Sequence, residues 1–196
     1  MARPLGGAFE GQPVQRDVVE AARNGSHEAF EALATADADR LYRIAFLILR
    51  DGPRAEDAVQ EALVHAWREL PRLRDPDRFD AWMRRLLVNA CADVGRHQRR
   101  WSAEVRVIHA EPMTQDGATA VADRDQLERG FRRLKAEQRA VVVLHFYVGL
   151  PVSEIAETLG VPAGTVKSRL HYATAILRAA LEADARGTVA TNGQTA

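Results

Sequence analysis

A chain of 196 residues with 46% hydrophobic content is long enough for one large or two small domains with real cores. A single cysteine, Cys91, excludes an internal disulfide, and no apolar run approaches the length that crosses a bilayer. The N-terminus also lacks a hydrophobic signal core, so the sequence predicts a soluble, cytoplasmic protein without membrane insertion.

The formal net charge is zero, but the charges are unevenly distributed along the chain. Four acids accompany two bases between Arg54 and Glu69, whereas five arginines accompany one aspartate between Trp82 and Trp101. Neighbouring segments of opposite charge predict two different partners, a protein for the acidic segment and a polyanion for the basic one.

The N-terminal half is predicted to be a helical bundle. Residues 1–16 are rich in Gly and Pro, which predicts a flexible leader. Residues 17–100 follow a helical period almost throughout, and no period-two strand pattern interrupts it. The third helix of this bundle is expected at Glu56–Leu70 and the fourth at Phe79–Arg100, with a proline-containing loop between them.

The predicted third helix carries an acidic cluster on its outward face. Asp57, Gln60 and Glu61 fall together at helical spacing, opposite an apolar stripe that includes Val59 and Leu63. An acidic helix face is most often simply solvated, so this cluster alone does not establish a docking surface.

The predicted fourth helix is basic. Arg85, Asn89 and Arg96 fall at i, i+4 and i+11 and therefore share one face. Cations and an amide beside aromatic rings suit single-stranded DNA, whose bases are splayed and stacked. Phe79 and Trp82 lie on the inward stripe, however, which favours a role in the core over stacking on bases.

Residues 101–124 lose the apolar period and gather Pro, Gly, Asp and Thr, which predicts a flexible linker. Helices resume over residues 125–184, and the small polar residues 185–196 predict a disordered tail. The expected fold is therefore all-α, with an N-terminal helical bundle and a C-terminal helical domain joined by the linker.

The C-terminal domain contains the pattern of a helix-turn-helix between Leu150 and His171. Ser153 is expected to cap the first helix, Gly160 to end it and Pro162 to lie in the first turn of the next. Facing outward on the second helix are Thr165, Lys167, Ser168, Arg169 and His171. Hydroxyls and cations at the start of a second helix are typical of contacts to phosphates and guanine edges in a major groove. The alternative is an ordinary helical hairpin with a solvated basic face.

The order of these motifs resembles an extracytoplasmic-function (ECF, group 4) bacterial RNA polymerase sigma factor. The resemblance rests on Asp57-x-x-Gln60-Glu61, on the basic helix that begins near Trp82, on the linker and on Gly164-Thr-Val-Lys-Ser-Arg-Leu170. It covers residues 28–100 and 127–182. Two sequence features depart from the usual pattern: Leu134-Lys135 replaces Leu-Pro, and Tyr172-Ala-Thr174 replaces an Arg-Ala-Arg run.

The resemblance implies a non-enzymatic initiation factor without cofactor or metal. It implies that Asp57, Gln60 and Glu61 bind core RNA polymerase. The residues that it implies for the −10 element are Arg85, Asn89, Arg96, Arg99 and Arg100. Those that it implies for the −35 element are Thr165, Lys167, Ser168, Arg169, His171 and Tyr172. It further implies promoter DNA and an anti-sigma factor as partners, with DNA melting at the −10 element.

Two other classes of function remain open from the residues alone. A stand-alone helix-turn-helix repressor or response regulator with a helical sensor half would leave the Asp57 and Arg85 faces unexplained, and a receiver would need strands that the pattern lacks. An enzyme is disfavoured because the six histidines show no metal-ligand spacing and no Gly-rich phosphate loop occurs. Cys91 lies near an inward stripe and is expected in the core.

Overall fold

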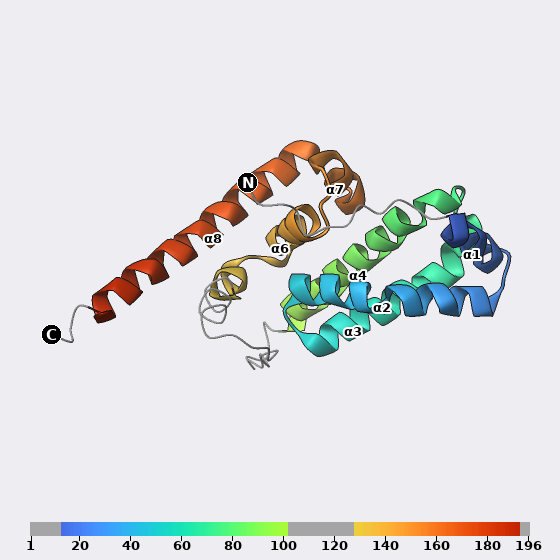
Figure 1. Ribbon diagram of the computed structural model, residues 1–196, viewed down its shortest axis with the longest axis horizontal. Coiled ribbons are helices and arrows are strands. Elements are labelled where there is room, and N and C mark those ends of the chain that lie inside the picture. Colours follow the sequence, from blue (N-terminus) through green and yellow to red (C-terminus); the bar gives the residue numbers. More distant parts are fainter. Residues whose placement is uncertain (1–12, 102–127, 193–196) are drawn as a thin grey trace.

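The computed structural model describes residues 13–101 and 128–192, and every regular element within these ranges is helical (Figure 1). This confirms the predicted all-α class. The N-terminal half comprises α1 (Pro13–Arg23), α2 (His27–Leu49), α3 (Gly52–Glu69), the 3₁₀ turns η1 (Leu70–Arg72) and η2 (Pro76–Arg78), and α4 (Phe79–Trp101). The C-terminal half comprises a helical segment at 128–133, α6 (Ala136–Val142), the π-helical turn η3 (Val143–Tyr147), α7 (Val152–Leu159) and α8 (Ala163–Asn192).

Side-chain caps set the starts of α2 and α3. The Ser26 hydroxyl accepts a hydrogen bond from the backbone N–H of Ala29 at 3.2 Å, and the Asp51 carboxylate accepts one from the N–H of Arg54 at 3.1 Å. Each bond satisfies a backbone donor that the first turn of a helix leaves without a partner. Because Asp51 caps α3 and Pro53 fits its first turn, α3 begins at Gly52 rather than at the predicted Glu56.

The N-terminal bundle buries the predicted apolar stripes. Leu41 and Ile44 of α2, Ala62 of α3, and Met83 and Leu87 of α4 are at most 1% exposed. The predicted core role of Phe79 is confirmed, since its side chain is buried, and half-buried Trp82 packs against the same core. Cys91 is buried as well, and burial raises the pKa of its thiol to about 12.

The C-terminal half is built around α6 and α8. The Gln138 side-chain oxygen accepts a hydrogen bond from the Lys135 backbone N–H at 2.9 Å at the start of α6, where the family pattern has proline. Gly130 in the segment 128–133 lies directly against α8, because a Cβ atom placed there would come within 2.9 Å of Leu177 and 3.3 Å of Ala180. This close approach docks the segment onto α8.

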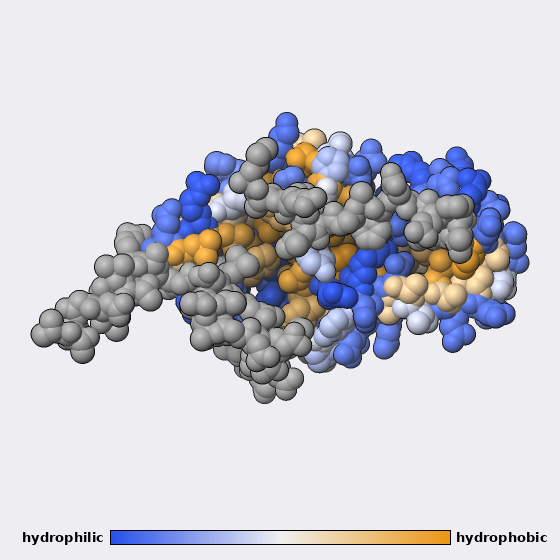
Figure 2. Space-filling model, viewed as in Figure 1, coloured by the Kyte–Doolittle hydropathy of each residue, from blue (hydrophilic) through white to orange (hydrophobic). Residues whose placement is uncertain are grey.

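The two halves pack against each other. Helix α4 contacts α6 and α7, α2 contacts α6 and η3, and one apolar core continues from Ile48 and Val88 to Leu144 and Ile155. Figure 1 shows α6 and α7 between α4 and the long α8, whose C-terminal end projects away from the other helices. On the face shown in Figure 2, hydrophilic residues follow the outer edge at the right, where the N-terminal half lies, and hydrophobic residues lie inside that edge.

Two predicted boundaries are wrong. Helix α1 begins at Pro13, so residues 13–16, predicted as leader, are helical, and Arg16 forms ion pairs with Glu20 and Asp77. Helix α8 continues to Asn192, so most of the predicted tail is helical, because extending an existing helix needs no new nucleus. The predicted linker, residues 101–124, lies outside the described residues except for Trp101, which ends α4. In the two described ranges, no helix is both long and apolar enough to span a membrane.

Candidate nucleic-acid interface

The turn between α7 and α8 has the geometry that the sequence predicts. Gly160 ends α7 in the left-handed region at φ 62°, and the next backbone N–H, that of Val161, donates to the Ala156 carbonyl at 3.1 Å. The Pro162 carbonyl then accepts from the N–H of Thr165 at 2.9 Å as α8 begins. The predicted cap is wrong: Ser153 lies inside the first turn of α7, and Pro151 is the N-cap. Tight turn geometry fixes α8 relative to α7.

Helix α8 has a buried inner face and an exposed outer face. Val166 is fully buried and Leu170 packs partly buried against the same core, as predicted. Exposed on the outer face are Lys167, Ser168, His171 and Tyr172, whereas Thr165 and Arg169 are half-buried. Tyr172 adds an aromatic ring to this surface, with the residue 63% exposed. The outer face therefore offers hydroxyls, cations and an aromatic ring to a polyanion.

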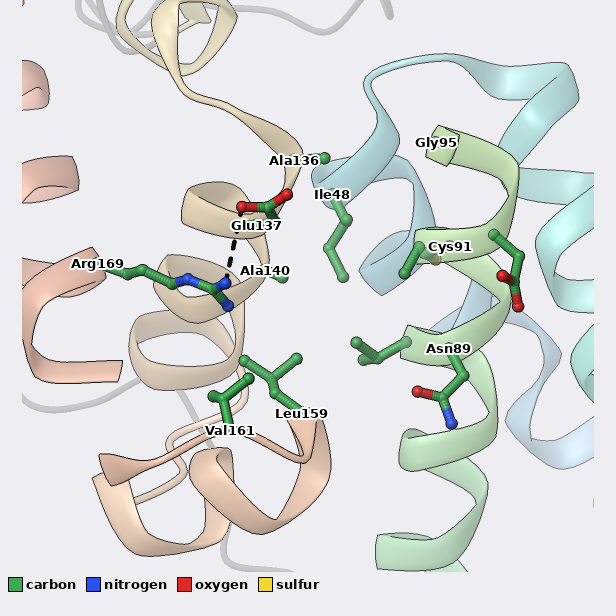
Figure 3. A pocket seen from close by; sticks show the side chains of 13 residues that line it. Ile48, Asn89, Cys91, Gly95, Ala136, Glu137, Ala140, Leu159, Val161 and Arg169 are labelled. Atoms are coloured by element: carbon green, nitrogen blue, oxygen red, sulfur yellow. Dashed lines mark ion pairs between the residues drawn. The ribbon is translucent and has the colours of Figure 1, made fainter. Parts of the chain in front are cut away.

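Two of the α8 side chains are held by neighbours. The Ser168 hydroxyl donates to the Thr165 carbonyl at 3.0 Å, one turn back along α8. The Arg169 guanidinium forms an ion pair with Glu137 of α6 at 3.7 Å (Figure 3). The pair joins helix α8 to α6.

The acidic cluster lies on the outer face of α3. Asp57, Gln60 and Glu61 are exposed, whereas Ala58 and Ala62, on the opposite side of the same helix, are fully buried. The structure thus brings the three predicted polymerase-binding residues together on one accessible helix surface. That surface is separate from the faces of α4 and α8.

The basic helix α4 presents its predicted residues unequally. Arg85 and Asn89 are exposed and lie one turn apart, while the side chains of Arg96, Arg99 and Arg100 lie outside the described residues, although their backbone belongs to α4. Arg84, which sequence reasoning counted only as a positive charge, is buried instead, at 8% exposure. Burial lowers the pKa of Arg84, and the nearby Asp80 and Glu154 oppose that shift. The sequence signal for its burial was its position beside the inward Met83.

A cleft of about 770 Å³ lies between the two halves, and it brings together residues from both predicted DNA-binding helices. Asn89 of α4 lines one wall, and Arg169 of α8, with its partner Glu137, lines the other (Figure 3). The rest of the lining is largely apolar and includes Val88 and Cys91, which lie on α4 beside Asn89. No sequence pattern predicted that these two helices would line one cleft, because the cleft depends on how the halves dock. In the described ranges, no cluster of His, Cys, Asp and Glu side chains has the arrangement of a metal site.

Comparisons with known proteins agree with this architecture. Residues 33–101 match the family Sigma-70 region 2, and residues 124–175 match Sigma-70, region 4. The ECF RNA polymerase sigma factor SigL of Mycobacterium tuberculosis is 36% identical over 155 residues, covering 77% of this chain and 88% of SigL. The RNA polymerase sigma-E factor of Streptomyces coelicolor is 34% identical over 154 residues, covering 79% of this chain and 86% of that protein.

Solved structures show the same fold. The structure of CnrH in complex with the cytosolic domain of CnrY aligns with a TM-score of 0.60 at 30% identity, covering 87% of this chain and 98% of that one. The sigma factor RpoE in complex with the anti-sigma factor NepR from Bartonella quintana aligns with a TM-score of 0.61 at 22% identity, covering 79% and 98%. With regions 2 and 4 in this order and relatives of this identity along most of its length, the chain belongs to the ECF RNA polymerase sigma factors.

Proposed function

We propose that this protein binds core RNA polymerase through α3 and directs it to promoters by reading a −10 element with α4 and a −35 element with α8. The observation that carries the proposal is that one chain exposes three different sets of polar side chains on three helices: the acidic cluster of α3, Arg85 and Asn89 of α4, and the outer face of α8. On this proposal residues 17–100 act as region 2, residues 101–124 as linker and residues 125–184 as region 4.

Electrostatics support delivery to DNA by a larger assembly. A small module alone binds DNA non-specifically at about 10⁻⁴–10⁻⁶ M, and a chain with zero formal net charge offers few additional phosphate contacts. Tethering both modules to polymerase gives each an effective concentration that reaches about millimolar, so modest contacts suffice. The missing Arg-Ala-Arg run after Leu170 is tolerable for the same reason.

The roles of the two helices differ. We propose that Lys167, Ser168, His171 and Tyr172, which are exposed near the start of the second helix, contact the edges and phosphates of duplex DNA, together with half-buried Thr165 and Arg169. Asn89 and Arg85, with Arg96, Arg99 and Arg100, belong to a helix whose amide and cations suit an unstacked base and its phosphates. In this division α8 selects the upstream duplex, and α4 holds melted DNA.

An anti-sigma factor is the proposed regulatory partner. The RpoE structure contains the anti-sigma factor NepR, and the CnrH structure contains the cytosolic domain of CnrY. We expect a protein of this kind to bind the present chain and to compete with polymerase. We also propose that the protein acts inside the cell, where polymerase and chromosomal DNA are found.

The test is run-off transcription with bacterial core polymerase on promoters mutated in one element at a time, with permanganate footprinting of melted DNA. Asn89→Ala should reduce melting and −10 selectivity but leave upstream protection and polymerase binding unchanged. Lys167→Ala should weaken −35 preference by about 1–3 kcal/mol for a lost base-edge contact. Normal melting by Asn89→Ala together with unchanged upstream preference in Lys167→Ala would refute these residue roles. Specific gel shift of promoter DNA without polymerase would indicate a stand-alone repressor instead.

A further inference from the structure

The packing of the two halves conflicts with simultaneous reading of two promoter elements. Asn89 and Arg169 line the same cleft. Elements centred at −10 and −35 are separated by about 25 base pairs, or roughly 85 Å of B-form duplex. Residues that share one cleft cannot contact both elements at once. The arrangement seen here is therefore a closed state, and the halves must separate when the promoter is bound.

An unusual backbone conformation lies where the halves meet. Arg50, which follows α2, has φ 60°, and it is the one non-glycine residue with positive φ in the described ranges. Its backbone N–H donates to the Phe46 carbonyl at 2.7 Å and ends the helix. Glycine is the usual residue at such a position, because a Cβ atom makes the left-handed region unfavourable. Arginine at this position suggests that the side chain has a role of its own.

The Arg50 side chain reaches across the interface. Its guanidinium donates to Glu128 of the C-terminal half at 2.5 Å and lies 5.4 Å from the centre of the Phe46 ring. The two side chains of the ion pair are only 17% and 30% exposed, so water screens them less than it screens a surface pair. Arg132 holds Glu128 from the other side at 3.4 Å. The pair joins residues 78 positions apart in the sequence and connects the halves directly.

Other charges at this interface oppose closure. Arg139 of α6 is half-buried, its Nε atom has no hydrogen-bond partner, and burial together with the charge of Arg50 lowers its pKa to about 10. Arg84 of α4 is buried beside α7, and its Nε atom also has no partner. Incompletely solvated buried cations destabilise the state that buries them. The shared apolar core and the bridging ion pair therefore favour the closed state. The two buried arginines, whose Nε atoms lack hydrogen-bond partners, oppose it.

We propose that Arg50 and Glu128 form a latch that holds the free chain closed, and that opening this latch makes the chain competent to bind polymerase and promoter DNA. The need for an open state and its consequence for promoter binding rest on the proposed function, whereas the ion pair that bridges the halves does not. In this chain the position carries arginine, although glycine would relieve the backbone, and the arginine side chain makes the bridge between the halves. A partner that binds only the open state would shift the balance toward it.

The latch is tested by energy transfer between dyes on the full-length chain, without polymerase. The labelling sites are Ala32→Cys on α2 and Ala175→Cys on α8, both exposed positions, in a Cys91→Ala background. Arg50→Gly should relieve the strained backbone and release the latch together, and Glu128→Gln should release the latch alone. Each should raise the ratio of open to closed molecules about three- to tenfold, as expected for one partly buried charged hydrogen bond.

Two controls separate a latch from general loosening. Glu69→Gln removes an ion pair with Arg72 that lies within the N-terminal half, and it should leave the open-to-closed ratio unchanged. Arg50→Gly combined with Glu128→Gln should open the chain no further than either change alone, because both remove the same interaction. An unchanged ratio in Arg50→Gly, an additive double variant, or equal opening by Glu69→Gln would each overturn the latch.

Polymerase binding tests the second half of the proposal. The latch variants should bind core polymerase more tightly in proportion to the fraction of open molecules that the energy-transfer measurement gives for each. Opening without a gain in affinity would show that the closed state does not restrain binding. If the variants open as expected but neither they nor the parent supports promoter-specific run-off transcription, the proposed function fails while the latch stands.

Discussion

Substitution of Gly130 tests whether close packing of the segment 128–133 against α8 stabilises the C-terminal half. A Cβ atom at this position would lie 2.9 Å from Leu177 Cδ2, 3.3 Å from Ala180 Cβ and 3.7 Å from Leu177 Cα. The Leu177 methyl can rotate away, but the Ala180 Cβ moves only with the backbone of α8. Gly130→Ala should therefore cost about 1–3 kcal/mol in overpacking.

The same substitution also has a favourable term. Alanine in a helix is preferred to glycine by about 1 kcal/mol, so the net effect of Gly130→Ala should lie between roughly neutral and about 2 kcal/mol destabilising. Gly95 of α4 provides the matched control, since nothing lies within 4 Å of a Cβ atom there. Gly95→Ala should gain the full helical preference and raise the melting temperature.

The assay is the melting temperature and the urea midpoint of the two variants and the parent by circular dichroism. For a protein of this size each kcal/mol corresponds to about 2–4 °C, so the variants should differ by several degrees, with Gly130→Ala the less stable. Equal stabilisation by the two alanines would show that the segment at Gly130 does not pack against α8 as described. Gly130→Val, which adds bulk that rotation cannot remove, should destabilise more strongly than Gly130→Ala.

Two further predictions concern α3 and the buried thiol. Replacing Asp57 and Glu61 by Lys should weaken binding to core polymerase in a pull-down or anisotropy assay. The melting temperature should change little, because exposed charges contribute little to stability. Unaltered affinity in the folded double variant would show that these residues lie outside the interface. Burial raises the pKa of Cys91 from 9.0 to about 12, so the thiol ionises at lower pH in the unfolded chain than in the folded one. The buried thiol therefore contributes its full stability below pH 9, and this contribution is lost as the pH rises toward 12. Urea unfolding of the parent and of Cys91→Ala across this range should show the steeper loss in the parent, and identical slopes would contradict the buried thiol.

Local sequence patterns determined the helices and their exposed faces. The Val166 and Leu170 spacing predicted the inner face of α8, and Gly160 predicted the turn before it, because periodicity and left-handed backbone preference act over a few residues. The motif order also predicted the ECF sigma factor family. Local patterns were weaker at boundaries: Ser153 resembled a cap but lies inside α7, and the Asp51 cap that starts α3 early was missed.

Only the tertiary structure decided what lies between the halves. The position of Arg84 beside inward Met83 hinted at its burial, but the packing of α7 against α4 comes from a distant part of the sequence and could not be predicted. The shared cleft of Asn89 and Arg169, and the bridge from Arg50 to Glu128, likewise depend on how two helical surfaces dock. Helix formation follows from interactions three or four residues apart. Docking joins residues far apart in the sequence, such as Arg50 and Glu128 at 78 positions, and a period read along one segment carries no information about its distant partner.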